Sequence, residues 1–211
     1  MTDQNHATTR VPGARIRLAA PGDAGQIAEI YAPIVRETPI SFELEPPDAA
    51  EFGRRLARYG AFAPWLVCER AGEILGYAYA SPHNERAAYQ WAVNVSIYAR
   101  ASARRLGLGR TLYGVLFDLL RLQGFIVACA GVTLPNAASV GLHEALGFAP
   151  VGVYRHVGYK FGGWHDVGWW QMDLQPPPAD PPPPLSLAGA MALPAWRDAL
   201  ERANRPSLAT E

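Results

Sequence analysis

Apolar side chains recur at helical spacing in four segments of the chain. The first two helices are expected to begin after Asp23 and Asp48, because aspartate is a favoured helix N-cap. The third helix ends at Gly124, and the fourth, residues 137–146, ends at Gly147, a residue type that favours the left-handed backbone found at helix ends. The third helix carries the clearest apolar stripe, formed by Leu112, Val115, Leu116, Leu119 and Leu120.

Strand patterns lie between these helices. Short apolar or alternating runs occur at residues 15–18, 65–69, 73–79, 91–98 and 125–132, and residues 151–174 are strand-like around a glycine-rich connection. Residues 70–72 are expected to form the turn of a hairpin. The alternation of helices and strands predicts an α/β fold.

One domain is expected over residues 15–174, with a flexible N-terminal arm at residues 1–14. The proline-rich run at residues 175–184 cannot be a helix or a central strand, because proline lacks an amide hydrogen and fixes φ. It predicts an extended polyproline segment. A short helix at residues 195–203 is expected to bury little, so residues 175–211 are interpreted as a tail.

Composition and charge exclude several classes of function. Apolar residues make up 49% and charged residues 18% of the chain, as in globular proteins. The 19 basic and 19 acidic residues give a formal net charge of zero, whereas nucleic-acid and anionic-membrane binders need a basic field. No apolar stretch approaches the roughly 18 residues that span a bilayer, and residues 1–10 lack the apolar segment of a secretion signal.

The two cysteines, Cys68 and Cys129, are too few for a disulfide framework or a four-cysteine zinc site. Both lie in strand-like runs and are expected to be small buried residues. His143 lacks the second histidine of a helical metal motif, so no metal is expected. The reduced cytoplasm is the simplest compartment for such a chain.

Residues 104–111 form a basic turn between a strand and a helix. Gly107 and Gly109 let backbone amides face an anion without an intervening Cβ, and the following helix adds unpaired amides and its dipole. The countercharge comes from Arg104, Arg105 and Arg110. This turn predicts a pyrophosphate site, although glycines at a helix start can also serve packing alone.

Two better-known phosphate loops do not fit this turn. A Walker A loop needs Gly-Lys-Ser/Thr at its end, and a Rossmann fingerprint needs a third glycine where Leu112 stands. The turn instead resembles the Arg/Gln-x-x-Gly-x-Gly/Ala turn of the GCN5-related N-acetyltransferases, which holds the pyrophosphate of coenzyme A.

The resemblance extends over about residues 15–174 and is strongest to the phosphinothricin acetyltransferase branch of that superfamily. Its most specific parts are Leu-His-Glu-Ala-Leu-Gly-Phe at residues 142–148 and Gly-Tyr-Lys-Phe-Gly-Gly-Trp-His-Asp-Val-Gly at residues 158–168. Residues 64–67, 76–80, 104–113 and 134–136 also resemble that branch.

The resemblance implies a fold, an activity and an assembly. The fold would be a mixed, mostly antiparallel twisted sheet with helices on both faces, and the coenzyme would enter where two central strands diverge. The activity would be acetyl transfer from acetyl-CoA to the amino group of a small amino-acid-like acceptor such as phosphinothricin or methionine sulfoximine. The assembly would be a homodimer with the late strands at its interface.

The resemblance also implies roles for individual residues. His143 stands beside the thioester sulfur, where the wider superfamily usually has a tyrosine, and Phe42, Arg86 and Tyr89 line the acceptor pocket. The residues implied to bind acetyl-CoA are Val95, Ile97, Tyr98, Arg104, Arg105, Leu106, Gly107, Leu108, Gly109, Arg110, Asn136 and Ser139.

Asn94 departs from the family pattern. The family reads Trp/Phe-Thr-Val/Leu-Glu, with the glutamate as the favoured general base, whereas residues 91–94 read Trp-Ala-Val-Asn. The amide nitrogen of asparagine is not basic. We therefore hypothesise that Asn94 orients the acceptor, and that His143, water or a loop carboxylate, Glu37 or Glu43, relays the proton.

The missing glutamate should slow the reaction without abolishing it. A positioned base contributes ~10²–10⁴-fold, while proximity supplies effective molarities of ~10⁵ M or more. An α-amino group with an unperturbed pKa of roughly 7.7–8.0 is about a tenth neutral at neutral pH, whereas a lysine amine is neutral in less than about one part in a thousand. Acceptors of the lysine type should therefore suffer most.

Structural interpretations remain open for several conspicuous residues. His143 could simply pack or cap within its helix. His165 and Asp166 resemble part of a triad, but no Gly-x-Ser-x-Gly elbow accompanies them, so a turn or dimer contact is favoured. The tryptophans of the late strands, Trp164, Trp169 and Trp170, indicate core or interface.

Other functions also remain open. The acceptor could be a polyamine or a protein N-terminus, and Asn94 could mark a coenzyme-binding regulator without activity. The proline-rich run could serve as an SH3-type ligand, but no basic residue flanks residues 177–184, and deletion of residues 175–211 should then leave acetyl transfer intact.

Overall fold

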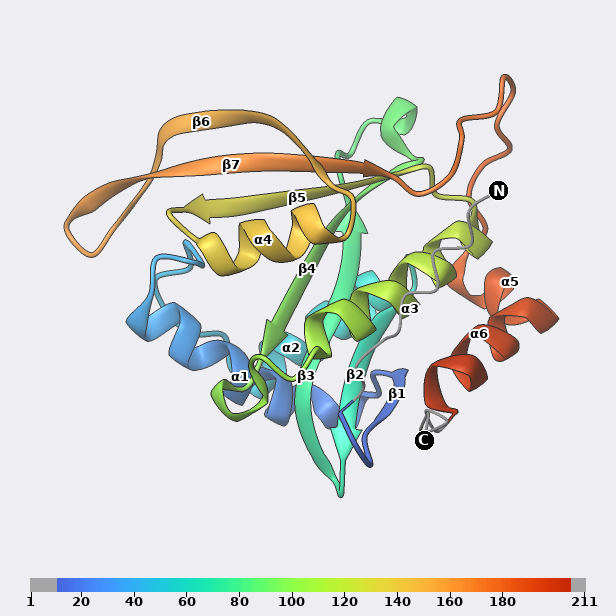
Figure 1. Cartoon of the computed structure of the whole chain (residues 1–211), viewed down its shortest axis with the longest axis horizontal. Coiled ribbons are helices and arrows are strands. Elements are labelled where there is room, and N and C mark those ends of the chain that lie inside the picture. The colour runs from blue at the N-terminus through green and yellow to red at the C-terminus, as the bar shows by residue number, and fades with distance from the viewer. Residues whose placement is uncertain (1–10, 206–211) are drawn as a thin grey trace, which may run out of the picture.

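The computed structural model describes residues 11–205. They form a seven-stranded sheet in the order β1-β2-β3-β4-β5-β7-β6 (Figure 1). The strands are β1 (Arg15–Leu18), β2 (Trp65–Arg70), β3 (Glu73–Pro82), β4 (Ala92–Ala99), β5 (Val127–Leu134), β6 (Ala149–Lys160) and β7 (Gly163–Asp173). All neighbours are antiparallel except β4 and β5, which confirms the predicted mixed, mostly antiparallel sheet.

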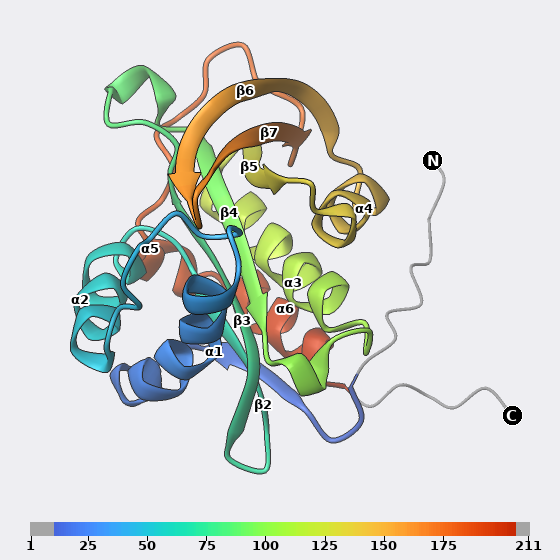
Figure 2. The ribbon, with the colours of Figure 1, turned by 90° about the vertical axis from the view of Figure 1, so that its left-hand side faces the viewer.

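Helices cover both faces of the sheet, as predicted. The helices are α1 (Ala24–Glu37), α2 (Ala49–Gly60), α3 (Leu108–Gln123), α4 (Ala137–Ala145), α5 (Leu187–Met191) and α6 (Pro194–Asn204), with short 3₁₀ turns η1 (Pro21–Asp23), η2 (Ala87–Tyr89) and η3 (Ala101–Ala103). Figure 2 shows α1 and α2 on one side of the central strands and α3 on the other. Two apolar clusters result, the larger one under α3 and the smaller one under α1 and α2.

Local signals place most helix ends as the sequence predicts. Gly124 and Gly147 both have left-handed φ values, of 93° and 96°, at the ends of α3 and α4. The Asp48 carboxylate caps α2 by accepting a hydrogen bond of 2.8 Å from the Glu51 amide. Asp23 differs, because its side chain makes no cap bond to α1 and instead pairs with Arg17 at 2.7 Å.

The central strands β4 and β5 separate after a short parallel contact. Their register pairs Ala92 with Val127, Val93 with Ala128, and Asn94 with Cys129, and no pairing follows that last pair. The backbone of β4 from Val95 onward is therefore bonded to β3 on one side and unpaired on the side of β5. The structure thus contains the strand divergence that the family resemblance implies.

The C-terminal segment differs from the sequence prediction of a helix with little to bury. Trp196 of α6 is 3% exposed, and Ala190 of α5 is fully buried. The proline-rich run leads to these helices along the domain, where the Trp91 indole donates a hydrogen bond of 2.8 Å to the Pro182 carbonyl. Gln123 at the end of α3 also donates to the Leu185 carbonyl. Residues 187–204 are therefore part of the folded body.

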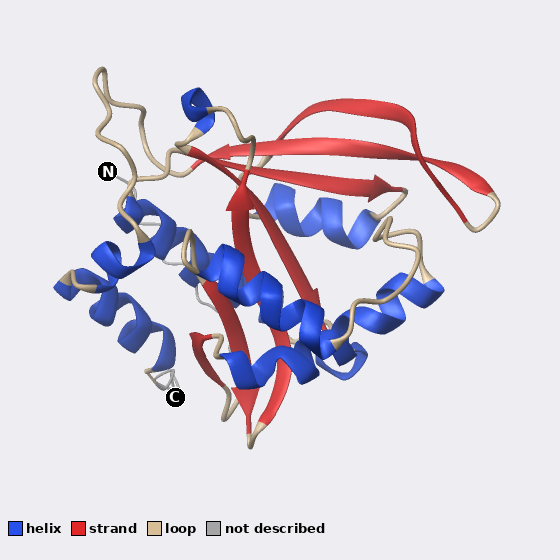
Figure 3. Cartoon of the chain, turned by 180° about the vertical axis from the view of Figure 1, so that it is seen from behind, coloured by secondary structure: helices blue, strands red, loops and turns tan. Residues whose placement is uncertain are grey.

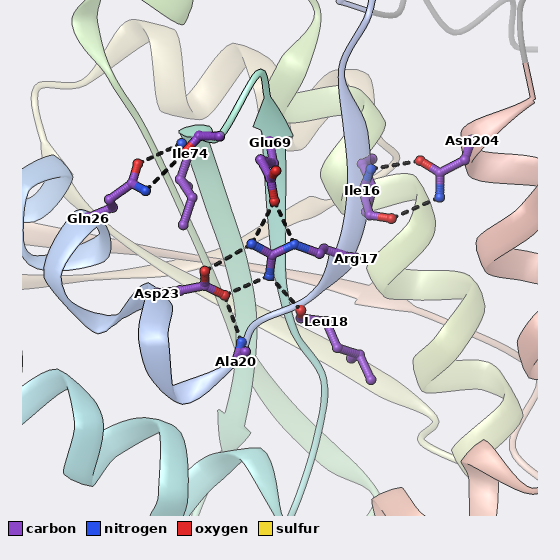
Figure 4. A network of polar contacts seen from close by, with 10 residues as sticks. Ile16, Arg17, Leu18, Ala20, Asp23, Gln26, Glu69, Ile74 and Asn204 are labelled. Carbon is purple, nitrogen blue, oxygen red and sulfur yellow. Dashed lines mark hydrogen bonds and ion pairs between the residues drawn. The ribbon is translucent and has the colours of Figure 1, made fainter.

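Polar contacts fix β1 to three other elements (Figure 4). Arg17 bonds Asp23 and Glu69, both at 2.7 Å, and thereby connects β1 to η1 and β2. On the outer side of β1, the Asn204 side chain accepts from the Ile16 amide at 2.7 Å and donates to the Ile16 carbonyl at 2.8 Å. Within residues 11–205, no helix combines the length and apolar character needed to cross a membrane.

Candidate active site

A cavity of about 70 Å³ lies where β4 and β5 diverge. Its walls come from both strands and from α3 and α4, and they include the side chains of Tyr113 and His143. Six of the residues predicted to act in the site converge on it, namely Val95, Ile97, Tyr98, Asn136, Ser139 and His143. The unpaired edge of β4 therefore faces a space between two helices.

His143 is held by hydrogen bonds on both ring nitrogens. Nδ1 lies 2.8 Å from the Ser139 carbonyl, which can only accept, so Nδ1 carries the proton. Nε2 then accepts from the Tyr113 hydroxyl at 3.2 Å. Burial lowers the pKa of His143, which favours this neutral form, and burial raises the pKa of Tyr113 well above its usual range.

Asn136 forms the N-cap of α4. Its Oδ1 accepts a hydrogen bond of 3.1 Å from the Ser139 amide, so this oxygen already has a structural role. The same residue lines the cavity. Asn136 therefore both caps the start of α4 and forms part of the cavity wall.

The basic turn lies at the start of α3, next to the cavity. Gly107 is the N-cap, with a left-handed φ of 75°, and the first helical bond runs from the Thr111 amide to the Gly107 carbonyl at 3.1 Å. The amides of residues 108–110 consequently have no acceptor within the helix, as at any helix start. The guanidinium groups of the turn belong to Arg104, Arg105 and Arg110, and Arg105 also has positive φ, 64°.

Gly109 has a packing role as well. A Cβ at this position would lie 2.9 Å from a methyl of Leu142 in α4 and 3.6 Å from a methyl of Ile97 in β4. The glycine thus lets α3 approach α4 and the diverging strand closely. Packing therefore contributes to the glycine pattern of this turn.

Asn94 lies at the last paired position before the strands diverge. Its Oδ1 is 2.9 Å from Nδ1 of His83, and its Nδ2 donates to the Pro82 carbonyl at 3.4 Å. His83 directly follows β3, and its ring lies 5.8 Å from that of Tyr89 and 6.2 Å from that of Trp169. A histidine and an aromatic wall therefore surround the residue that replaces the expected glutamate.

The predicted acceptor residues are brought together unevenly. Tyr89 packs against the His83 ring, which in turn is hydrogen-bonded to Asn94. Arg86, in contrast, is exposed at the start of η2. Phe42 belongs to the loop after α1, and its ring covers Gly158 of β6 and lies 6.2 Å from the His165 ring.

A buried lysine fixes the loop that carries Phe42. Lys160 Nζ donates hydrogen bonds of 2.7 Å to the Val35 and Ser41 carbonyls, and burial lowers the pKa of this amine. The end of α1 and the loop after it are thereby attached to β6. The loop that carries Phe42 therefore has a defined position.

A larger groove of about 590 Å³ runs between α2 and the α1-facing side of β3. Glu43 lies in it and accepts hydrogen bonds from Arg55 at 2.8 Å and from the Tyr31 hydroxyl at 3.2 Å. Ser81, which pairs with Asn94 across the sheet, lines the end of this groove. Glu43 is thus engaged by a cation, and Glu37 is exposed at the end of α1.

Sequence reasoning missed two residues of the site, Tyr113 and His83. Tyr113 is fully buried in α3 and meets His143, which lies 30 residues later in the chain. His83 follows the strand that pairs Pro82 with Val93, so counting the register of that strand pair would have placed it beside Asn94. The contact between His83 and Asn94 lies where the two strands separate, and the contact between Tyr113 and His143 lies at the cavity between them.

Comparison with known proteins supports the family resemblance. The profile of the GNAT acetyltransferase domain matches residues 16–169. A phosphinothricin N-acetyltransferase of Streptomyces viridochromogenes is 42% identical over 170 residues, which cover 81% of this chain and 92% of that protein. An L-methionine sulfoximine/L-methionine sulfone acetyltransferase of Pseudomonas aeruginosa is 38% identical over 168 residues, 77% of this chain and 96% of that protein.

A solved structure gives the same assignment. The phosphinothricin acetyltransferase of Sinorhizobium meliloti in complex with AcCoA superposes with a TM-score of 0.76 at 32% identity, over 83% of this chain and 98% of that one. The matched family profile spans the sheet and the helices that build the cavity. The chain described here belongs to the GNAT acetyltransferase family.

Proposed function

We propose that this protein transfers an acetyl group from acetyl-CoA to the amino group of a small amino-acid-like acceptor of the phosphinothricin or methionine sulfoximine type. The observation that carries the proposal is the cavity at the β4–β5 divergence, because its wall contains the unpaired edge of β4, and Gly109 of the basic helix start packs against Ile97 in that wall. The relatives named for acetylation of such acceptors support the substrate class.

The coenzyme side of the site fits a molecule with amide groups and a diphosphate. Backbone N–H and C=O groups of residues 95–98 that face β5 have no strand partner, and such groups need hydrogen bonds when they are buried. The amide groups of a pantetheine arm would supply them. The free amides of residues 108–110 and the three arginines of the turn would hold the pyrophosphate.

The reaction requires a neutral amine beside the thioester. The amine nitrogen forms a bond to the carbonyl carbon, the carbon–sulfur bond breaks, and coenzyme A leaves as a thiolate that takes up a proton. Burial raises the pKa of the Cys129 thiol opposite Asn94, which disfavours the thiolate needed for an acyl-enzyme route. Direct transfer from coenzyme to acceptor is the simpler path.

The acceptor would occupy the α1-facing side of the divergence. Phe42 and Tyr89 would offer apolar walls there, and the exposed Arg86 guanidinium would approach an acceptor carboxylate. The Trp169 indole N–H is buried and has no hydrogen-bond partner among the described residues.

A homodimer forms the second part of this proposal. The β6–β7 hairpin extends well beyond the helices (Figure 3). It carries exposed apolar side chains on both strands, namely Val151, Val153, Tyr154, Val157, Tyr159 and Trp164. Exposed apolar side chains that gather on one element are typical of interfaces between protein chains. We also place the protein in the reduced cytoplasm, since both cysteines are free and buried.

Thiol release from acetyl-CoA tests the activity. Phosphinothricin and methionine sulfoximine should give turnover, whereas spermidine and a peptide with a free N-terminus should give little. Turnover with the peptide or the polyamine alone would reassign the acceptor. Calorimetric binding of acetyl-CoA without turnover of any amine would favour a coenzyme-binding regulator, and absence of binding would contradict the proposal.

A further inference from the structure

We propose that His83 accepts the proton that the acceptor amine must lose, and that Asn94 is the positioning residue for its ring. This inference rests on the proposed acetyl transfer and names the base that the sequence lacks. The observation behind it is the hydrogen bond of 2.9 Å between His83 Nδ1 and Asn94 Oδ1.

The bonds of Asn94 determine which nitrogen of His83 is free. The Pro82 carbonyl can only accept, so the Asn94 amide directs Nδ2 toward it and Oδ1 toward His83. Oδ1 is also only an acceptor, so Nδ1 of the neutral ring carries the hydrogen. Nε2 therefore holds the lone pair, and it has no hydrogen-bond partner within residues 11–205.

The position of this lone pair suits a base for the acceptor. Asn94 marks the last paired residue before the strands diverge, and His83 attaches to the same strand through its own amide, which donates to the Ala92 carbonyl at 3.3 Å. The ring is half-buried between Tyr89 and Trp169. It thus faces the wall that we assign to the acceptor and lies on the opposite side of the divergence from His143.

The side chains that pack around the ring carry no formal charge. Tyr89 of η2 flanks it, Tyr154 of β6 lies behind Trp169, and Cys129 of β5 lies across from Asn94. The charged residues of its own loop, Glu85 and Arg86, are exposed. Among the described residues, no carboxylate forms an ion pair with His83.

Two of the other proposed bases, His143 and Glu43, are already engaged, and Glu37 is exposed at the end of α1. His143 has both ring nitrogens bonded, with Nε2 accepting from Tyr113, and burial lowers its pKa. Glu43 is paired with Arg55. Histidine changes charge between pH 5 and 8, the range in which a base for an amine must work.

Protons and bonds balance over the whole reaction. The acceptor enters as R–NH₃⁺ and loses one proton to His83 Nε2, which gives the neutral amine and an imidazolium. The amine nitrogen bonds to the acetyl carbon and the carbon–sulfur bond breaks. The nitrogen loses its second proton, the departing thiolate gains one, and the imidazolium returns its proton to water. The net products are R–NH–acetyl, coenzyme A and one H⁺.

Substitution of His83 by glutamine tests the inference. Glutamine can keep the hydrogen bond to Asn94 but cannot accept a proton. We expect kcat/KM for the acceptor to fall about 10²-fold at pH 7, the lower end of the contribution of a positioned base. The deficit should shrink as the pH rises, because more of the acceptor is then already neutral. The dissociation constant of acetyl-CoA, measured by calorimetry, should not change.

Three further variants complete the experiment. His156→Gln, at an exposed histidine of β6, is the matched control and should behave as the parent. Asn94→Leu should lower kcat/KM and change the pH profile, because the ring loses its anchor. Asn94→Glu in the His83→Gln background should recover at least about tenfold of the lost kcat/KM, because a carboxylate then stands beside the acceptor.

Two outcomes would overturn the inference while the parent enzyme remains active. One is a His83→Gln enzyme within about threefold of the parent at pH 7, and the other is a loss that stays constant across the pH range. If His83→Gln does not fold, an unchanged pH profile for Asn94→Leu overturns the inference on its own. A parent protein that acetylates no amine would instead contradict the proposed function itself.

Discussion

The two edge strands of the sheet, β1 and β6, differ in whether another element of the chain covers them. At one edge, β1 has four residues, and α6 closes its outer side through the two hydrogen bonds between Asn204 and Ile16. At the other edge, β6 has twelve residues, and its first nine positions are exposed. One edge is covered by the protein's own C-terminal helix, and the other faces outward.

An uncovered edge strand is a template for pairing with another chain. The β6 edge shows features that limit uncontrolled pairing, because its register with β7 shifts twice and His156 has a left-handed φ of 51°. Its apolar side chains nevertheless remain exposed. The comparison indicates that the β1 edge is devoted to stability of the single chain, whereas the β6 edge is available for association.

The largest effect is expected at the covered edge. Trp196→Ala removes the main side chain that α6 buries and should lower the free energy of unfolding by about 3–5 kcal/mol. Urea denaturation followed by circular dichroism measures this difference. A change below about 1 kcal/mol would mean that α6 contributes little to stability, as the sequence alone suggests.

The hydrogen bonds to β1 should contribute less than the burial of Trp196. Asn204→Leu leaves the N–H and C=O of Ile16 without their side-chain partner and should cost about 1–3 kcal/mol. The same denaturation experiment measures it. Asn204→Asp retains an acceptor for the Ile16 amide and should cost less than the leucine variant; equal losses would argue against the importance of that bond.

Acid should weaken the β1 edge through Asp23. The hydrogen bond from Arg17 holds the pKa of this carboxyl below its ordinary value of 3.8. The folded state thus binds the proton less readily than the unfolded state, so this stabilisation is complete above about pH 3.8 and is lost as the pH falls through the lowered pKa. Asp23→Asn should flatten the fall in stability below pH 4, and an unchanged acid profile would contradict this.

The smallest effect on unfolding is expected at the β6 edge. Trp164 is 64% exposed, so Trp164→Ala should change the free energy of unfolding of the monomer by less than about 0.5 kcal/mol. The same variant should weaken the proposed homodimer, which sedimentation velocity detects. A parent protein that sediments as a monomer at all concentrations would contradict the dimer. Trp196→Ala is the control with the opposite expectation, because it should change the free energy of unfolding far more than Trp164→Ala does.

Sequence reasoning succeeded where the determinants are local. The stripe from Leu112 to Leu120 and the glycines at positions 124 and 147 define α3 and α4 without reference to the rest of the chain. The turn at Gly107 is likewise predictable from the glycines and arginines within it. In each case the pattern and its consequence lie within a few residues.

It failed where a side chain depends on a distant partner. Trp196 becomes buried only because its helix meets α3 and β1, and no pattern within residues 195–203 reveals that surface. Asp23 was expected to cap a helix, yet Arg17 takes its carboxylate. His83 and Tyr113 entered the site through contacts across a strand pair and between two helices.

The bond between Ile16 and Asn204 has a consequence for synthesis of the chain. The two residues are 188 positions apart, so a ribosome that adds about 5–20 residues per second needs roughly 10–40 s to produce the second after the first. During that interval the first strand can fold against β2 while its outer side stays open. The nascent protein thus passes through a stage in which both sheet edges can attract other chains, and this stage lasts until α6 is synthesised and covers the β1 edge.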